Sequence, residues 1–244
     1  MGSHGLRCSG MPGPEPHQRR LLYGRRQNHK LSARQATLFL DFLPRLSLPD
    51  GPLEPRALFP GKNGLALEVG FGGGEHLAYQ AALHPDWGFI GCEPFVNGMA
   101  QALTRVSAEK LTNIRLHHGD ARDVLERLPA AVLDAVYVLY PDPWPKKRHW
   151  KRRFIGPDTI PLLAHVLKSG GLLRIASDIP DYIAWCLTHL ARDPNFLWAA
   201  ETPADWRNPP RDWPGTRYEV KALKAGRVPT YLDFRRLPSD GKCT

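Results

Sequence analysis

The sequence predicts an α/β fold built on a mostly parallel sheet, and three observations support this prediction. From residue 64 onward, short apolar runs alternate with stretches of helical periodicity, as in a parallel sheet with helices on both faces. The first apolar run leads into a glycine-rich turn. The last two runs, 216–226 and 229–237, alternate with period two and predict an antiparallel hairpin.

Two segments precede the predicted sheet. Residues 1–30 are rich in Gly, Pro, Arg and His and show no hydrophobic period, which predicts a flexible basic arm. Residues 31–63 begin with apolar side chains on one helical face, with Ser32 as the N-cap and Pro44 as the end of the helix, and continue as a proline-rich linker. The remaining residues, 64–244, form the predicted α/β domain.

The predicted elements follow one another in regular order along this domain. The apolar runs predicted as strands are 64–70, 88–93, 113–120, 131–140 and 172–178. The stretches predicted as helices are 75–84, 96–111, 121–128, 156–171 and 180–193. With the hairpin, the strands make a seven-stranded, mostly parallel sheet that ends in an antiparallel pair, which is the layout of Rossmann-like class I methyltransferases.

Composition limits the compartment and the partners. The net charge of +9 and the pI near 9.6 favour a polyanionic partner, with nucleic acid preferred over an acidic membrane surface. The four cysteines lie far apart without a C-x-x-C pair, so neither a zinc site nor a disulfide framework is expected. No apolar run approaches the roughly 20 residues that span a bilayer, and no apolar segment follows the basic N-terminal residues. We therefore expect a cytoplasmic protein without a metal.

The glycine-rich turn after the first strand indicates a cofactor site. The dinucleotide fingerprint G-x-G-x-x-G requires a glycine three residues after Gly72, where this chain has Glu75. A pyrophosphate would also be repelled by the carboxylate of Glu68, whereas S-adenosylmethionine carries a positive sulfonium and ammonium and no phosphate. We therefore predict S-adenosylmethionine as the cofactor, bound by Glu68, Gly70 and Gly72.

Two further acids follow the next two predicted strands. Glu93 ends the second strand, where α/β cofactor sites accept hydrogen bonds from ribose hydroxyls, and Asp120 ends the third, within reach of an adenine amino group. Each acid alone could be a helix N-cap or a solvated carboxylate. Together with Glu68, they place an acid at the ends of three successive predicted strands, which favours the cofactor site.

The segment after the fourth strand, 141–153, has the sequence PDPWPKKRHWKRR. Its three prolines restrict the backbone that carries Asp142, which we place beside the cofactor pocket. Six of the eight residues from Lys146 to Arg153 are Lys or Arg and can contact phosphates, while Trp144 and Trp150 can stack on an unpaired base. The alternative is a solvated basic loop with Trp144 in the core.

These motifs resemble the tRNA (guanine-N7-)-methyltransferases of bacterial type. The matching segments are EVGFGGGEHL, PDPWPKKRHWKRR, RIASD, TRYE with the closing LDF, and RLLYGRRQNHKLSARQ near the N-terminus. The resemblance extends from about Arg20 to the end, and Trp150 departs from it, because members of the family often have His there.

The resemblance implies methyl transfer from S-adenosylmethionine to N7 of a guanine in the tRNA variable loop, at position 46 in tRNA numbering. It implies cofactor contacts from Glu68, Glu93, Asp120 and Asp142, with Asp142 also catalytic. It implies substrate contacts from Lys146, Asp178, Thr216, Arg217, Tyr218 and Glu219. It implies RNA contacts from Arg148, His149, Trp150, Lys151, Arg152 and Arg153.

The chemistry of guanine N7 suggests a mechanism without a general base. N7 carries an in-plane lone pair, so it attacks a methyl group without first losing a proton. We therefore expect catalysis through proximity, alignment and electrostatics, with Asp142, Asp178 and Glu219 accepting hydrogen bonds from the guanine N1 and N2 edge. For Asp178, a role as a helix cap is an equal alternative on sequence alone.

Two other functions share features with this sequence. A methyltransferase acting on an exocyclic amine of RNA or DNA also places an acid or amide before proline after its fourth strand, but its usual [DN]-P-P-[YFW] motif differs from Asp142-Pro143-Trp144. A non-catalytic RNA-binding protein would be expected to have lost the glycines and acids of the turn, and this chain retains them. His117 and His118 point to opposite faces of a strand, which disfavours a metal site, and the loop 204–216 could either cover substrate or pack on the sheet.

Overall fold

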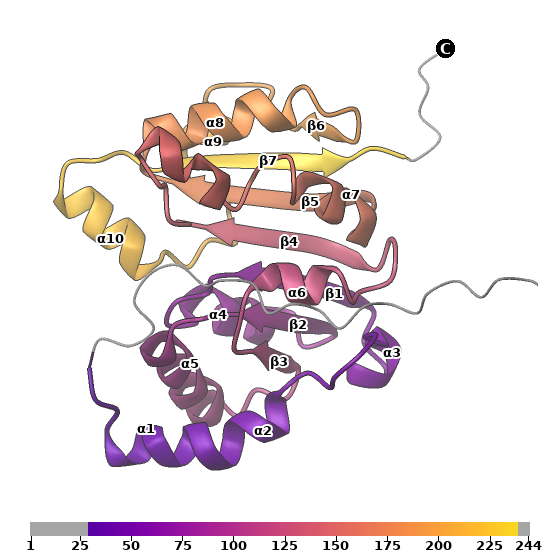
Figure 1. The fold of residues 1–244 in the computed structure, drawn as a ribbon, viewed down its shortest axis with the longest axis vertical. Coiled ribbons are helices and arrows are strands. Elements are labelled where there is room, and N and C mark those ends of the chain that lie inside the picture. Colours follow the sequence, from indigo (N-terminus) through magenta and orange to yellow (C-terminus); the bar gives the residue numbers. More distant parts are fainter. Residues whose placement is uncertain (1–28, 239–244) are drawn as a thin grey trace, which may run out of the picture.

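The computed structural model describes residues 29–238, and their strands form one seven-stranded sheet in the order β3-β2-β1-β4-β5-β7-β6 (Figure 1). Strands β1 to β5 run parallel, and β7 is antiparallel to both β5 and β6. The strands are β1 (Gly64–Val69), β2 (Trp87–Cys92), β3 (Ile114–His117), β4 (Leu133–Leu139), β5 (Leu167–Ser177), β6 (Phe196–Trp198) and β7 (Thr230–Arg236). The α/β fold with a mostly parallel sheet and a C-terminal antiparallel pair is therefore confirmed.

The predicted partner of the last strand was wrong. Residues 216–226 do not form a strand: they contain the helix α10 (Arg217–Lys224). The antiparallel partners of β7 are β5 and the short strand β6, which pairs Phe196 with Arg236. A helix forms because Thr216 and Glu219 make a complete capping box, and this local signal outweighs the alternation of apolar and polar residues.

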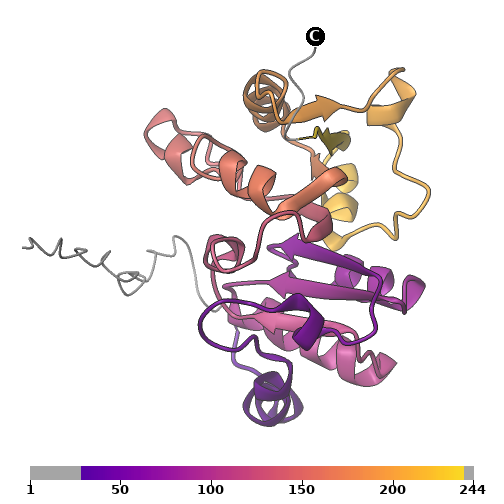
Figure 2. The same ribbon diagram turned by 90° about the vertical axis from the view of Figure 1, so that its right-hand side faces the viewer.

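Helices cover both faces of the sheet (Figure 2). One apolar cluster contains buried residues of α4 and α5, and the other contains buried residues of α6, α7 and α8. These helices are α4 (Glu75–Leu83), α5 (Val96–Glu109), α6 (Ala121–Leu125), α7 (Ile160–Val166) and α8 (Pro180–Leu190). Further short helices are α3 (Pro55–Leu58), η2 (Lys147–Arg152) and α9 (Ala204–Arg207).

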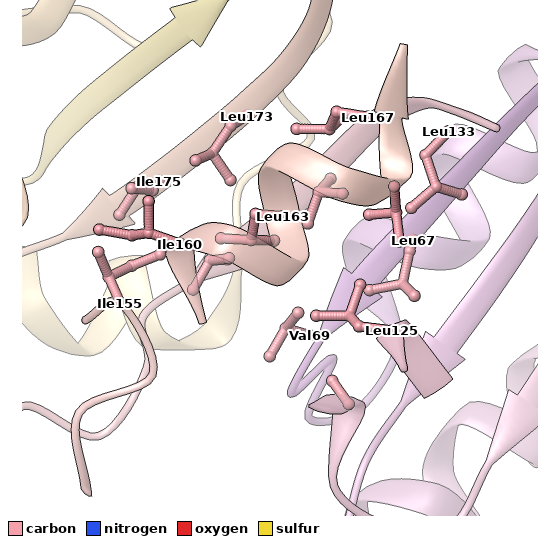
Figure 3. Packing of buried hydrophobic residues seen from close by; sticks show 14 of the residues in the cluster. Leu67, Val69, Leu125, Leu133, Ile155, Ile160, Leu163, Leu167, Leu173 and Ile175 are labelled. Atoms are coloured by element: carbon pink, nitrogen blue, oxygen red, sulfur yellow. The ribbon is translucent and has the colours of Figure 1, made fainter. Parts of the chain in front are cut away.

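The core explains why the central strands read as unbroken apolar runs. Every residue of β1 is buried, because helices pack on both of its faces. Figure 3 shows Ile160 and Leu163 of α7 among side chains from β1 and β5, including Leu67 and Leu173. Each fully buried leucine of this kind contributes about 1.5–3 kcal/mol through removal of apolar surface from water.

The leading helix forms as three consecutive segments, α1 (Ala33–Thr37), η1 (Leu38–Phe42) and α2 (Leu43–Leu46). Ser32 caps the first of them, as predicted, by accepting a hydrogen bond from the backbone N–H of Gln35. The prediction that Pro44 ends the helix was wrong. The π-helical turn of η1 precedes Pro44, which lies in the first turn of α2, where its missing N–H costs little.

The predicted basic arm, 1–30, lies almost entirely outside the described residues. Within the described range, no helix combines the length and apolar character needed to cross a membrane. The same range contains no group of three or more His, Cys, Asp or Glu side chains arranged to hold a metal ion. Nε2 of His117 lies 3.9 Å from Oδ2 of Asp123, and the ring of His118 packs edge-on against the ring of Phe39.

Candidate active site

The glycine-rich turn connects β1 to α4 at the carboxyl edge of the sheet. Gly70, Gly72 and Gly74 all have positive φ, at 64°, 58° and 74°, which glycine adopts without steric cost. The turn also packs closely against α5, because a Cβ on Gly98 would lie 2.5 Å from the carbonyl oxygen of Gly72. These glycines leave a backbone-lined hollow at the point where the strand order reverses between β1 and β4.

Glu93 follows β2 and is buried beside this turn. Its Oε2 accepts a 2.7 Å hydrogen bond from the N–H of Gly72, and its Oε1 accepts a 2.9 Å hydrogen bond from the N–H of Phe95. Burial raises the pKa of Glu93 to about 7, although both backbone donors oppose this shift. The carboxylate therefore holds the glycine turn to the start of α5 and lines the pocket above it.

Asp120 follows β3 and caps α6, accepting a 2.9 Å hydrogen bond from the N–H of Arg122. The Arg122 guanidinium also donates to it, at 3.0 Å from Nε and 2.5 Å from Nη2. Asp120 lines a second pocket together with Gly70 and Asp142. Both sequence interpretations of Asp120 are thus compatible with its position, since it caps a helix and also faces a pocket.

Asp142 lines both pockets, one shared with Glu93 and the other shared with Asp120. It follows β4 in a turn flanked by two residues with positive φ, Tyr140 at 51° and Trp144 at 41°. Non-glycine residues adopt this conformation rarely and at a cost of roughly 1–3 kcal/mol, and such residues cluster at functional sites. Partial burial raises the pKa of the Asp142 carboxyl above its ordinary value.

Glu68 is near Glu93, whose pKa its charge helps to raise, but it does not line either pocket. It is 3 % exposed on β1, and its Oε2 is 2.8 Å from Nδ1 of His76, which is 1 % exposed. The His76 ring packs against Tyr137 and Trp213. The structure therefore places the Glu68 carboxylate in a buried pair with His76 beneath the turn, while the pockets are lined by Glu93, Asp120 and Asp142.

Helix α10 lies beyond the carboxyl ends of the parallel strands (Figure 1) and carries the TRYE motif. Tyr218 covers the glycine turn, because a Cβ on Gly72 would lie 3.0 Å from its ring, and it stacks on Tyr140 with ring centroids 6.4 Å apart. Arg217 and Tyr218 line the pocket that contains Glu93 and Asp142. The helix thus forms one wall of the site.

The other residues of the motif have internal partners. Thr216 and Glu219 cap the helix reciprocally. The Glu219 carboxylate also accepts hydrogen bonds from Trp213 Nε1 at 2.6 Å and from the Tyr231 hydroxyl at 2.5 Å. Asp178, which follows β5, accepts a hydrogen bond from Nε of Arg227. The sequence indicates these residues as site candidates, but it does not indicate the partners that hold their side chains.

The basic segment after β4 divides into exposed and buried residues. Four of its six Lys and Arg side chains are exposed and project around η2: Lys146, Lys147, Arg148 and Lys151. Arg152 is partly buried, with its guanidinium over the ring of Trp144 at 5.0 Å. His149 lies edge-on against the same ring.

Arg153 is 4 % exposed and is an internal anchor. Its Nε donates a 2.8 Å hydrogen bond to the carbonyl of Pro143, and its Nη2 pairs with Asp181. The guanidinium also lies over the rings of Trp150 and Trp185, at 5.0 and 4.9 Å from their centroids. Arg153 and Trp150 therefore form a cluster with α8 that supports the exposed residues.

The tryptophan-containing loop, 204–216, packs on the sheet. Trp206 and Trp213 contact the apolar clusters on the two faces. Between them, Asp212 accepts a 3.0 Å hydrogen bond from Arg174, and its carbonyl accepts one of 2.8 Å from Gln80. The loop therefore has the packing on the sheet that was one of the two arrangements compatible with the sequence.

The fold is that of the Rossmann-like class I methyltransferases. Among solved structures, it resembles the 16S rRNA methyltransferase KamB with a TM-score of 0.55 and 16 % identity, covering 75 % of this chain and 92 % of that one. An antibiotic-related methyltransferase matches with a TM-score of 0.51 and 12 % identity, covering 78 % and 97 % of the two chains. At these identities the likeness concerns the fold alone.

Closer relatives define the family. Residues 62–231 match the model of a family described as a putative methyltransferase. A tRNA (guanine-N(7)-)-methyltransferase of Nitrobacter hamburgensis is 52 % identical over 219 residues, which cover 88 % of this chain and 86 % of the relative. One from Azorhizobium caulinodans is 50 % identical over 88 % of this chain and 94 % of the relative. The chain belongs to the tRNA (guanine-N(7)-)-methyltransferase family.

Proposed function

We propose that this chain transfers the methyl group of S-adenosylmethionine to N7 of a guanine in the variable loop of tRNA. The observation that carries the proposal is the position of Asp142, which lines both pockets at the carboxyl end of β4. The exposed basic residues of η2 follow it directly in the chain. Asp142 is thus close both to the proposed cofactor site and to the basic surface of η2, which is suited to binding phosphates. The names of the relatives support the same substrate.

The residues around the pockets fit S-adenosylmethionine, which supplies an electrophilic methyl group on a positively charged sulfur. Glycines of the turn leave room for a ligand against the backbone, and the three acids Glu93, Asp120 and Asp142 favour a cation. Glu93 is placed to accept hydrogen bonds from ribose hydroxyls and Asp120 to accept one from an adenine amino group. Glu68, which pairs with His76 and is near Glu93, adds a fourth negative charge that favours a cationic cofactor.

Asp142 is the acid best placed to select guanine. The carboxylates of Asp178 and Glu219 are held by Arg227 and by Trp213 and Tyr231, whereas Asp142 faces the pockets. An ionised Asp142 accepts hydrogen bonds from the guanine N1–H and N2–H groups, which adenine does not present in the same arrangement. It also stabilises the positive charge that develops on the base as N7 is methylated.

The test is methyl transfer from labelled S-adenosylmethionine to an unmodified tRNA transcript, with the labelled nucleoside identified by mass spectrometry. The expected product is 7-methylguanosine in the variable loop. A transcript carrying adenine in place of that guanine is the matched control and should remain unlabelled. Labelled N2-methylguanosine or N6-methyladenosine would instead establish an amine methyltransferase, and absence of label in every transcript would refute the proposal.

A further inference from the structure

Glu75 occupies the position at which the turn departs from the dinucleotide fingerprint, and the proposed methyl transfer gives it no role. It is the first residue of α4, where the helix dipole favours an acid. Its Oε1 accepts two hydrogen bonds from Arg217 of α10, 2.8 Å from Nε and 2.6 Å from Nη2. This ion pair connects the glycine turn to α10 across 142 positions of sequence.

The guanidinium of Arg217 also lies directly against the backbone at position 73. A Cβ on Gly73 would lie 1.4 Å from Nη2 of Arg217, so any other residue there would displace the guanidinium. Arg217 also lines the pocket that contains Glu93 and Asp142. Its positive charge would oppose a cationic ligand in that pocket, and the carboxylate of Glu75 offsets this charge.

Helix α10 depends on such anchors. It has eight residues, and isolated helices shorter than about 12–15 residues are marginal in water. Its apolar side chains contribute little, because Val220 and Leu223 are 50 % and 57 % exposed. Glu219 fixes the helix to Trp213 and Tyr231. The pair between Arg217 and Glu75 fixes it to the glycine turn.

We propose that Arg217 and Glu75 are positioning residues whose ion pair holds α10 against the glycine turn, so that the order of this helix and the affinity for the cofactor are coupled. The proposal rests on the proposed function only in taking S-adenosylmethionine as the occupant of the pocket. Arg217 then acts on cofactor affinity through Glu75 and the turn.

The test compares the full chain with Glu75→Gln, which removes the charge and keeps the shape. It also includes Arg217→Glu alone and the exchanged pair Glu75→Arg/Arg217→Glu. Glu109→Gln is the matched control, because Glu109 pairs with Arg105 on the adjacent α5 at a similar exposure. Two quantities are measured: the Kd for S-adenosylhomocysteine by calorimetry, and hydrogen exchange of residues 220–224 in the free protein.

For Glu75→Gln we expect the Kd to rise about fivefold, the upper value for a partly exposed ion pair, together with faster exchange in α10. The exchanged pair should recover part of both losses relative to Arg217→Glu alone. Identical behaviour of Glu75→Gln and Glu109→Gln, or no recovery in the exchanged pair, would overturn the proposal. The exchange measurement needs neither cofactor nor tRNA, so a failure of the proposed function is recognised separately, by absence of methyl transfer in the unmodified chain.

Discussion

Arg174 on β5 and Asp233 on β7 stand directly opposite each other across the antiparallel strands, and the guanidinium donates two 2.9 Å hydrogen bonds to the carboxylate. A third hydrogen bond, of 3.0 Å, connects Arg174 to Asp212 in the loop 204–216. Burial opposes the charge on Arg174, but the two acids outweigh it and raise its pKa. This group of three residues joins the parallel part of the sheet to its antiparallel edge.

The first prediction concerns stability. Asp233→Asn should lower the free energy of unfolding by about 2 kcal/mol, because it leaves a buried arginine with a weaker partner. The loss is smaller than for a fully buried pair, since Asp233 is 29 % exposed and Asp212 remains. Urea denaturation measures it. Glu109→Gln, which removes an exposed pair, should change stability by no more than about 0.5 kcal/mol, and equal losses in the two variants would contradict this account.

The second prediction concerns the dependence of stability on pH. Burial raises the pKa of Glu93 from 4.5 to about 7 in the folded chain, so between these values the folded state binds more protons than the unfolded state. The contribution of this group to stability is therefore fully present below about pH 4.5 and is lost as the pH rises through about 7. The unmodified chain should lose stability relative to Glu93→Gln over this range. Parallel stability curves for the two proteins would show that the pKa is not raised.

Cofactor binding should respond to the same group in the opposite direction. The ionised carboxylate is the better acceptor for ribose hydroxyls, so affinity for S-adenosylhomocysteine should increase as the pH rises through about 7. Calorimetry between pH 5.5 and 8.5 measures this change, and Glu93→Gln corrects for titration of the ligand. An equal pH dependence in both proteins would exclude Glu93 as its source.

The fourth prediction concerns tRNA binding. If the four exposed basic residues around η2 each neutralise a phosphate, the logarithm of the association constant for tRNA should fall against the logarithm of the salt concentration with a slope of about 3. Phosphate contacts from all six Lys and Arg residues of the segment would give a slope of about 4 to 5. Arg148→Ala should reduce the slope by about 1. Arg235→Ala is the control. Arg235 is exposed, and it pairs with Leu172 of β5, at the end of the sheet away from η2. A slope that Arg148→Ala leaves unchanged would remove this residue from the interface.

Much of the fold was predictable because its signals are local. The buried strands appear as apolar runs, and the glycine turn and the prolines around Asp142 mark where they end. The error at 216–226 arose where two local signals conflict. The spacing of Thr216 and Glu219 is that of a capping box and indicates a helix, whereas the alternation of apolar and polar residues in the same segment indicates a strand.

The partners of the site residues were not predictable, because they depend on contacts between distant parts of the chain. Glu68 and His76 are eight residues apart and both appear in the turn motif, yet their sequence does not indicate that they pair. Arg153 belongs to the same basic run as the exposed Lys and Arg residues. Only its contacts with α8 in three dimensions show that it is buried. Residue type and spacing therefore located the site, while three-dimensional packing separated the groups that face ligands from those that support them.

The last prediction concerns Asp142 itself. Asp142→Ala should reduce kcat/KM for tRNA methylation on the order of 100- to 1,000-fold, the usual effect of removing one preorganised electrostatic group. Asp142→Asn should be similarly impaired, because the amide has no charge to stabilise the cationic product. Asp181→Asn is a useful comparison, because it alters the anchor of Arg153 and tests whether a disturbed loop alone gives the same loss. Activity of Asp142→Ala within tenfold of the unmodified chain would show that Asp142 is not catalytic, and would shift the selection of guanine to Asp178 or Glu219.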